Sequence, residues 1–117
     1  MIAPTTGIRV FLAPGPTDMR KAIDGLALLV ADAMDLDPMS GSLFVFCNRK
    51  RDIIKILYWD RNGFCLWQKR LEKQKFPWPN STSDVRRIGI DEMRYLLDGI
   101  DIDKIYRHRP EKYITIT

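Results

Sequence analysis

Cysteine and histidine are scarce in this sequence, which excludes the sites and cross-links that these residues usually build. Two cysteines, Cys47 and Cys65, cannot supply a disulfide framework, and we expect both to be free, buried thiols. With the single histidine, His108, they fall short of the four ligands of a structural zinc site. No neighbouring residue would orient His108 as a general base, so we expect no nucleophilic catalysis and no enzymatic activity.

Long hydrophobic runs are also missing. No run approaches the roughly 20 apolar residues that a membrane helix needs, so we expect no membrane insertion. The N-terminus lacks the basic start and apolar stretch of a signal peptide, which favours a cytoplasmic location. A glycine-rich phosphate loop is missing as well, because segment 13–17 has one glycine and no Lys-Ser/Thr ending. We therefore expect no bound nucleotide cofactor and no other cofactor.

The chain does have enough apolar residues to bury a core. It has 117 residues, of which 45% are hydrophobic and 10% are aromatic. This length favours a single domain over residues 1–117, with a core at about 7–100 and a basic tail at 101–117.

The order of apolar runs and turn residues predicts an α+β domain. We expect a mainly antiparallel sheet with one long amphipathic helix packed on a face and a short C-terminal helix. Asp91 is expected to cap the start of the short helix, and Gly99 is expected to occupy its C-terminal cap position. The expected strands are 7–13, 43–47, 53–59, 64–71 and 85–90, with 113–117 as a further edge strand.

The long helix is predicted by apolar residues at three- and four-residue spacing. Thr17 or Asp18 would cap its first turn, and Asp37 and Pro38 would end it. We expect its apolar stripe to face the core. The stripe consists of Met19, Ala22, Ile23, Leu26, Leu29, Val30, Ala33 and Met34.

The strongest turn signal is Asn62-Gly63, which lies between two strand-like runs and predicts a β-hairpin. A two-residue loop at these positions pairs Tyr58 with Trp67. A three-residue loop that ends at Gly63 pairs Tyr58 with Leu66 instead. The sequence leaves both registers open, and the register decides which faces Lys69 and Arg70 take.

Positive charge is concentrated in the middle of the chain. The net charge is +4, yet residues 49–75 alone carry nine basic and three acidic side chains. This pattern is typical of a surface that faces a polyanion, although strands also carry cations simply to keep an edge soluble. Two more cations lie at the predicted helix N-terminus, which itself suits anions. The candidate DNA-binding residues are Arg49, Lys50, Arg51, Lys55, Arg61, Lys69, Arg70, Lys73 and Lys75, with Arg20 and Lys21.

Aromatic residues are interleaved with these cations. We assign Tyr58 and Trp67 mainly to the core. Trp78 is held between two prolines and is the aromatic residue that we most expect to be exposed, either on nucleic acid or as an interface anchor. Phe76 precedes it in the same segment. Phe76 and Trp78 are therefore the candidate partner-binding residues.

Carboxylates are the remaining residues that bear on catalysis. Asp18, Asp60 and the group Asp98, Asp101 and Asp103 are the only candidates for a magnesium-dependent nuclease. Helix capping and turn chemistry explain each of them sufficiently. We therefore predict neither a metal site nor a catalytic residue.

A series of short motifs resembles the TnpB accessory proteins of IS66-type insertion sequences. The resemblance covers residues 7–102, and the basic tail from Lys104 departs from it. The RNA-guided nuclease of the same name is unrelated. The motifs are TDMRK at 17–21, LFVF at 43–46, KILYWD at 55–60, GF at 63–64, KRL at 69–71, FPWP at 76–79 and LLDGID at 96–101.

This resemblance implies a bacterial, cytoplasmic protein that supports transposition beside a separate transposase, which carries the DDE-type chemistry. It defines no catalytic residue. Our leading hypothesis is a non-catalytic accessory protein that binds the DNA ends of the insertion sequence through a basic hairpin surface at 49–75. The alternative is an adaptor that binds the transposase or its companion accessory protein without touching DNA. Segment 76–79 and the predicted edge strand 113–117 motivate this alternative.

Overall fold

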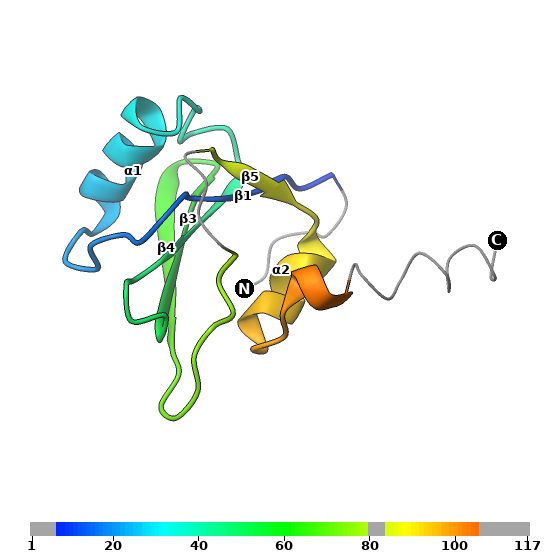
Figure 1. The fold of residues 1–117 in the computed structure, drawn as a ribbon. Helices are drawn as coiled ribbons and strands as arrows, with labels where there is room; N and C mark the ends of the chain where they lie inside the picture. Colours follow the sequence, from blue (N-terminus) through cyan, green and yellow to red (C-terminus); the bar gives the residue numbers. More distant parts are fainter. Residues whose placement is uncertain (1–6, 80–83, 106–117) are drawn as a thin grey trace, which may run out of the picture.

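A five-stranded sheet lies between two short helices in the computed structural model, which describes residues 7–79 and 84–105 (Figure 1). The α+β class is confirmed. None of the helices in these two ranges is long and apolar enough to cross a membrane. The elements are β1 (Val10–Leu12), α1 (Ile23–Asp32), β2 (Leu43–Cys47), β3 (Ile53–Asp60), β4 (Gly63–Arg70), β5 (Arg86–Ile88) and α2 (Ile90–Leu97).

The strand order in the sheet is β4-β3-β2-β1-β5. β1 and β2 are parallel because the crossover through α1 connects them, and the other three pairings are antiparallel. The sheet is thus mainly antiparallel, as predicted. The predicted strand 113–117 lies outside the described residues.

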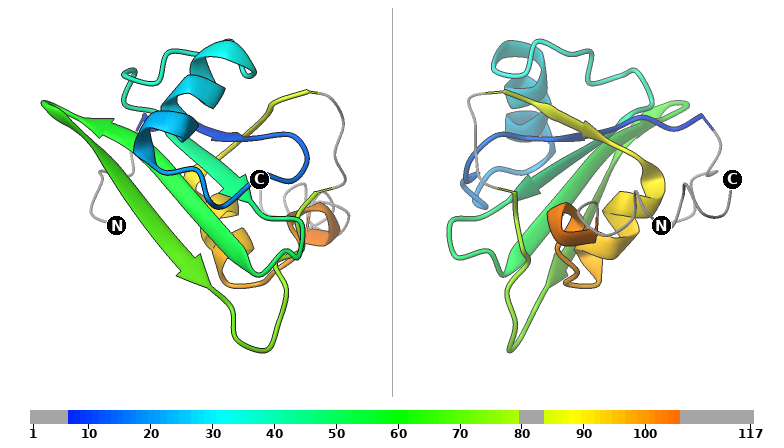
Figure 2. Two further views of the ribbon diagram at one scale, coloured as in Figure 1. Left: turned by 90° about the vertical axis from the view of Figure 1, so that its left-hand side faces the viewer. Right: turned by 45° about the vertical axis from the view of Figure 1, so that its right-hand side comes forward.

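Both faces of the sheet are covered, one by α1 and the other by α2 (Figure 2). Leu43, Val45 and Cys47 of β2 pack toward α2, whereas Phe44 and Phe46 pack toward α1. All five residues of β2 are buried, because both faces of this strand are covered. The two cores therefore meet at this strand.

The predicted long helix is wrong in its extent. α1 is a ten-residue helix that starts after Ala22, and neither Thr17 nor Asp18 caps it. The carbonyl oxygens of Met19 and Lys21 instead accept hydrogen bonds from the Lys55 ammonium group, at 2.8 and 2.9 Å. This tertiary contact holds the residues before Ala22 in a turn.

The far end of α1 also comes earlier than predicted. The helix ends at Asp32, and Asp35 adopts a left-handed conformation with φ of 55°. Leu26, Val30 and Met34 of the predicted stripe are buried, whereas Ala22 and Ala33 are exposed. The inward face of the helix was predicted correctly, but its length was not.

The short C-terminal helix is confirmed, with Met93 and Leu96 buried. It begins one residue before the predicted cap, Asp91, because the Glu92 carboxylate accepts a hydrogen bond from the N–H of Gly89 (2.8 Å). Gly99 has φ of 81° after the helix, as its predicted capping role requires.

Neither predicted register of the β3–β4 hairpin is correct. Tyr58 pairs with Cys65, and Asp60 pairs with Gly63, so the two-residue loop is Arg61-Asn62. The N–H of Asn62 donates to the carbonyl oxygen of Asp60, and Arg61 takes φ of 51°. The positive φ therefore falls on an arginine and not on Gly63, which is why the Asn-Gly signal placed the turn one residue too late.

Because Arg61 has a left-handed backbone, we expect Arg61→Gly to raise the free energy of unfolding by about 0.5–1 kcal/mol, since glycine adopts positive φ without a steric cost. Thermal and urea unfolding measure the change. Asn62→Gly is the control, because Asn62 has no positive φ and should lose stability when replaced. A less stable Arg61→Gly variant would contradict this turn geometry.

Candidate nucleic-acid interface

Three chain segments that are distant in the sequence meet at one end of the sheet (Figures 1 and 2). The turn 48–52 joins β2 to β3, segment 71–79 follows β4, and segment 13–17 follows β1. The N–H of Phe76 donates to the carbonyl oxygen of Arg51 (2.6 Å), and the N–H of Thr17 donates to that of Cys47 (2.8 Å). Backbone hydrogen bonds therefore fix the loops beside one another.

The turn 48–52 is held in place by the side chain of Asn48. Its Oδ1 accepts hydrogen bonds from the N–H groups of Asp52 and Ile53, each at 3.0 Å, and its Nδ2 donates to the Asp52 carboxylate (2.6 Å). This last hydrogen bond is the main reason why the pKa of Asp52 is lowered, and the nearby charges of Lys75 and Lys50 add to the effect. These hydrogen bonds thus hold the backbone of the turn that carries the arginines between Asn48 and Asp52.

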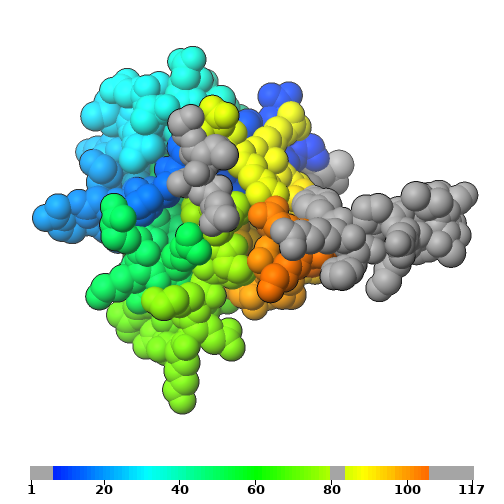
Figure 3. All heavy atoms as spheres, viewed as in Figure 1, coloured from blue at the N-terminus to red at the C-terminus, as the bar shows by residue number. Residues whose placement is uncertain are grey.

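Five exposed cations gather on two of these segments. Lys75 Nζ donates to the carbonyl oxygen of Lys50 (2.7 Å), which brings the two basic segments together. In Figure 3 the green atoms of the turn and the yellow-green atoms of segment 71–79 adjoin on one face. We call this group the basic end; it comprises Arg49, Lys50, Arg51, Lys73 and Lys75.

The cations of the hairpin itself are placed differently. Lys55 is only 8% exposed, and its ammonium is bonded to the carbonyl oxygens of Met19 and Lys21. Lys69 Nζ donates to the carbonyl oxygen of Leu97 (2.8 Å), at the end of α2 where a cation is favoured. The predicted hairpin surface is therefore not one continuous basic face.

Two further predicted cations form ion pairs, and one of them lies far from the basic end. Arg61 lies 3.9 Å from the Asp60 carboxylate. Arg70 pairs with Glu72 at 2.8 Å, which raises the pKa of Arg70 and lowers that of Glu72. Arg61 stands at the hairpin tip, at the opposite end of β3 from the basic end.

The two cations at the predicted helix N-terminus lie in the turn before α1. Arg20 pairs with Asp18 at 2.7 Å, and its hydrogen bonds to that carboxylate lower the pKa of Asp18 to about 2. Lys21 is exposed. Neither residue belongs to a helix, so the anion-binding contribution of a helix N-terminus does not apply to them.

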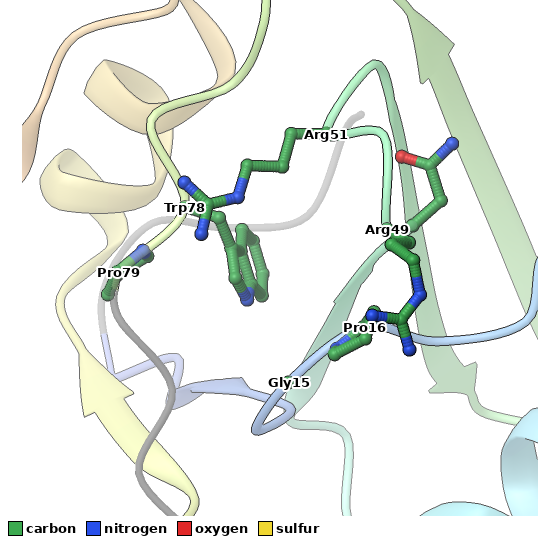
Figure 4. A pocket seen from close by; sticks show the side chains of 7 residues that line it. Gly15, Pro16, Arg49, Arg51, Trp78 and Pro79 are labelled. Carbon is green, nitrogen blue, oxygen red and sulfur yellow. The ribbon is translucent and has the colours of Figure 1, made fainter.

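A pocket of about 130 Å³ opens beside the basic end (Figure 4). Gly15 and Pro16 form one side, Arg49 and Arg51 stand at another, and Trp78 closes it together with Pro79. The indole of Trp78 points into the pocket between the two arginines, as Figure 4 shows. One aromatic ring and two guanidinium groups therefore surround the same space.

The prediction that Trp78 is exposed is wrong. It is 7% exposed, and Phe76 is 1% exposed. Both pack into the core on the α2 face of the sheet, against which Tyr58 and Trp67 also lie as predicted. The hydrogen bond from Phe76 to Arg51 draws this segment back across the sheet, and the burial removes both aromatic side chains as projecting anchors.

The carboxylates proposed for the nuclease alternative are dispersed. Asp18 pairs with Arg20, and Asp103 accepts a hydrogen bond from Arg86 at 2.7 Å. Residues 7–79 and 84–105 hold no group of three or more histidine, cysteine, aspartate or glutamate side chains that could bind a metal ion. His108 lies outside the described residues.

The two cysteines are free, as predicted, but only one of them is fully buried. Cys47 is buried, and Cys65 is half-buried. Burial raises the pKa of the Cys47 thiol to about 12. Cys47 is therefore a neutral core residue at physiological pH, and it has no thiolate for nucleophilic chemistry.

Sequence reasoning missed the pocket, because its walls come from three segments that only the folded chain brings together. The charge of Arg51 was recognised in the sequence, but its φ of 62° was not, because sequence patterns assign this conformation to glycine or asparagine. The paired prolines around Gly15 and Trp78 were the only local indication that both segments bend at this place.

Comparisons with known proteins agree with the resemblance in the motifs. The family described as "IS66 Orf2 like protein" matches residues 8–107. The uncharacterized protein y4hO of Sinorhizobium fredii is 37% identical over 113 residues, which cover 97% of this chain and 95% of that protein. The uncharacterized protein y4jC of the same organism is 35% identical over 115 residues, covering 96% and 98%. No solved structure matches the chain.

Proposed function

Because this chain belongs to the family of IS66 Orf2-like proteins, which implies an accessory role in transposition, we propose that it binds DNA through the basic end. The observation that carries the proposal is the fixed convergence of the turn 48–52 and segment 71–79, which presents five exposed cations together. Phosphate contacts of this kind supply most of the affinity of non-specific DNA binding.

The local electrostatics support the basic end rather than the hairpin. Its cations have one acidic side chain at the turn, Asp52, which already accepts a hydrogen bond from Asn48. In contrast, Arg70 is paired with Glu72, and Lys55 and Lys69 are not exposed and donate to backbone carbonyl groups. Lys75 also donates to a carbonyl oxygen, that of Lys50, but it remains exposed. A phosphate can therefore approach the basic end without first breaking an internal ion pair.

The adaptor hypothesis loses its main argument in this structure. It relied on segment 76–79, in which Trp78 was expected to be exposed, and both Phe76 and Trp78 are buried in the core. Its second argument, the edge strand 113–117, lies outside the described residues. DNA is therefore the partner that we propose, and binding to the transposase is the alternative that the test below examines.

Titration of labelled DNA from the ends of the insertion sequence tests the proposal. If five cations meet phosphates, log K should fall against log salt concentration with a slope of about −4 to −5. The double variant Lys50→Gln/Lys73→Gln should make the slope less steep by about 2, because it removes two of these contacts.

The double variant Arg61→Gln/Arg94→Gln is the charge-matched control. It removes the same number of positive charges away from the basic end and should leave the slope close to that of the wild type. Binding that is absent at low salt, or that does not depend on salt, overturns the proposal. A pull-down with the transposase then decides whether the protein acts as an adaptor.

A further inference from the structure

We propose that the pocket beside the basic end receives one unpaired nucleotide of a DNA strand. Its base would pack against Trp78, and its flanking phosphates would meet Arg49 and Arg51. This inference rests on the proposed function, because the same basic end would hold the rest of the strand. It adds a preference for single-stranded or distorted DNA, which a purely electrostatic surface would not have.

The chemistry of the pocket walls fits a nucleotide. Trp78 is largely buried, and the part of its side chain that lines the pocket offers an aromatic contact for a base. The guanidinium groups of Arg49 and Arg51 offer planar donors for phosphate oxygens (Figure 4). Pro16 and Pro79 add apolar surface to the walls. An apolar wall beside two guanidinium groups suits a ligand that has both an aromatic base and an anionic phosphate.

The size of the pocket limits the ligand to one ring. A protein cavity of about 150 Å³ accommodates benzene, and this pocket has about 130 Å³ and is open to solvent. A single base that enters from outside can use this space, whereas a base pair cannot. The base must therefore leave its stack before it reaches Trp78.

The backbone that carries the pocket walls is held by hydrogen bonds before any ligand arrives. Arg51 is hydrogen-bonded through its carbonyl oxygen to Phe76, two residues before Trp78, and Asn48 holds the turn that carries both arginines. A preformed backbone avoids part of the entropic cost of ordering the loops on binding. The pocket is thus a built feature of the fold.

The backbone of Arg51 supports a role in binding. A non-glycine residue at positive φ is strained, and such strain is concentrated at binding sites. Arg61 shares this conformation at the hairpin tip, where it does not line the pocket. The two arginines therefore make a matched pair, because glycine relieves the same strain and removes the same charge in each.

Fluorescence polarisation with a short oligothymidylate and a duplex of equal length tests the inference at constant salt. Stacking of one base on an aromatic side chain should make the single strand bind about 5- to 100-fold more tightly than the duplex. Arg51→Gly should abolish most of this preference, and Arg61→Gly should keep it. Thermal unfolding of both variants verifies that they remain folded. Thymidine monophosphate serves as a third ligand.

The outcomes separate this inference from the proposed function. If neither DNA binds, the proposed function fails and the inference fails with it. If both DNAs bind equally, or if both glycine variants change the preference alike, the pocket assignment is overturned while DNA binding stands. If thymidine monophosphate binds as tightly as the oligonucleotide, the ligand is a free nucleotide and the assignment to a strand is overturned.

Discussion

Replacing Phe76 with alanine should lower the free energy of unfolding by about 3–5 kcal/mol, the usual cost of removing a fully buried phenylalanine side chain. Phe76 is 1% exposed and belongs to the core between the sheet and α2. The substitution would leave a cavity beside Trp78 and loosen the segment that carries Lys73 and Lys75. Urea unfolding followed by circular dichroism measures the loss.

Leu28→Ala is the control for this prediction. Leu28 is 61% exposed on α1, so its replacement should change the free energy of unfolding by no more than about 0.5 kcal/mol. If Phe76→Ala were as stable as Leu28→Ala, Phe76 would not lie in the core. It would then be free to bind a partner, the role for which the sequence made it a candidate.

Replacing Lys55 with alanine should cost about 2–4 kcal/mol of stability, because hydrogen bonds from a charged donor contribute more than neutral ones. The ammonium of Lys55 donates to the carbonyl oxygens of Met19 and Lys21 at 2.8 and 2.9 Å. Without it, both oxygens lose this donor and the turn before α1 loses its attachment to β3. Urea unfolding and proteolysis in the region before α1 report the two effects.

Lys73→Ala is the matched substitution for Lys55→Ala. Lys73 is exposed at the basic end, so its loss should leave stability almost unchanged and weaken DNA binding. Lys55→Ala should lower stability and leave DNA binding unchanged. At temperatures where this variant stays folded, the salt slope of its DNA binding should equal that of the wild type. Weaker DNA binding with unchanged stability in Lys55→Ala would place Lys55 on the surface and contradict this structure.

The strands were predictable because their residues carry the signal locally. The apolar run Leu43–Cys47 is buried on both faces, and Val10 and Leu12 alternate onto one face of β1. Burial of apolar side chains dominates the energetics of such segments, so their pattern survives in the fold. The α+β class followed from the same pattern.

Positions that depend on a single tertiary contact were not predictable. The predicted helix does not extend to the residues before Ala22, because Lys55 donates hydrogen bonds to carbonyl oxygens in that segment. Lys55 is more than thirty residues away in the sequence. The predicted hairpin register is wrong because Arg61 adopts the positive φ that the pattern assigned to the Asn-Gly pair. The local sequence indicates neither the Lys55 contact nor the positive φ of Arg61.

The candidate site was predictable in its charge and not in its geometry. The excess of cations at 49–75 pointed to a polyanion, and Arg49, Lys50 and Arg51 are exposed as expected. Charge counting does not reveal that Lys55 turns inward or that Arg70 is paired with Glu72. The burial of Trp78 was missed for the same reason, since flanking prolines indicate a bend but not its direction.

Photo-cross-linking locates bound DNA on the protein most directly. DNA with photoreactive groups on its phosphates is irradiated with the full-length protein, and the cross-linked peptides are identified by mass spectrometry. We expect cross-links in segments 48–52 and 71–79, which carry the basic end. Cross-links concentrated at the hairpin tip around Arg61 or on α1, with none in these two segments, would contradict DNA binding through the basic end.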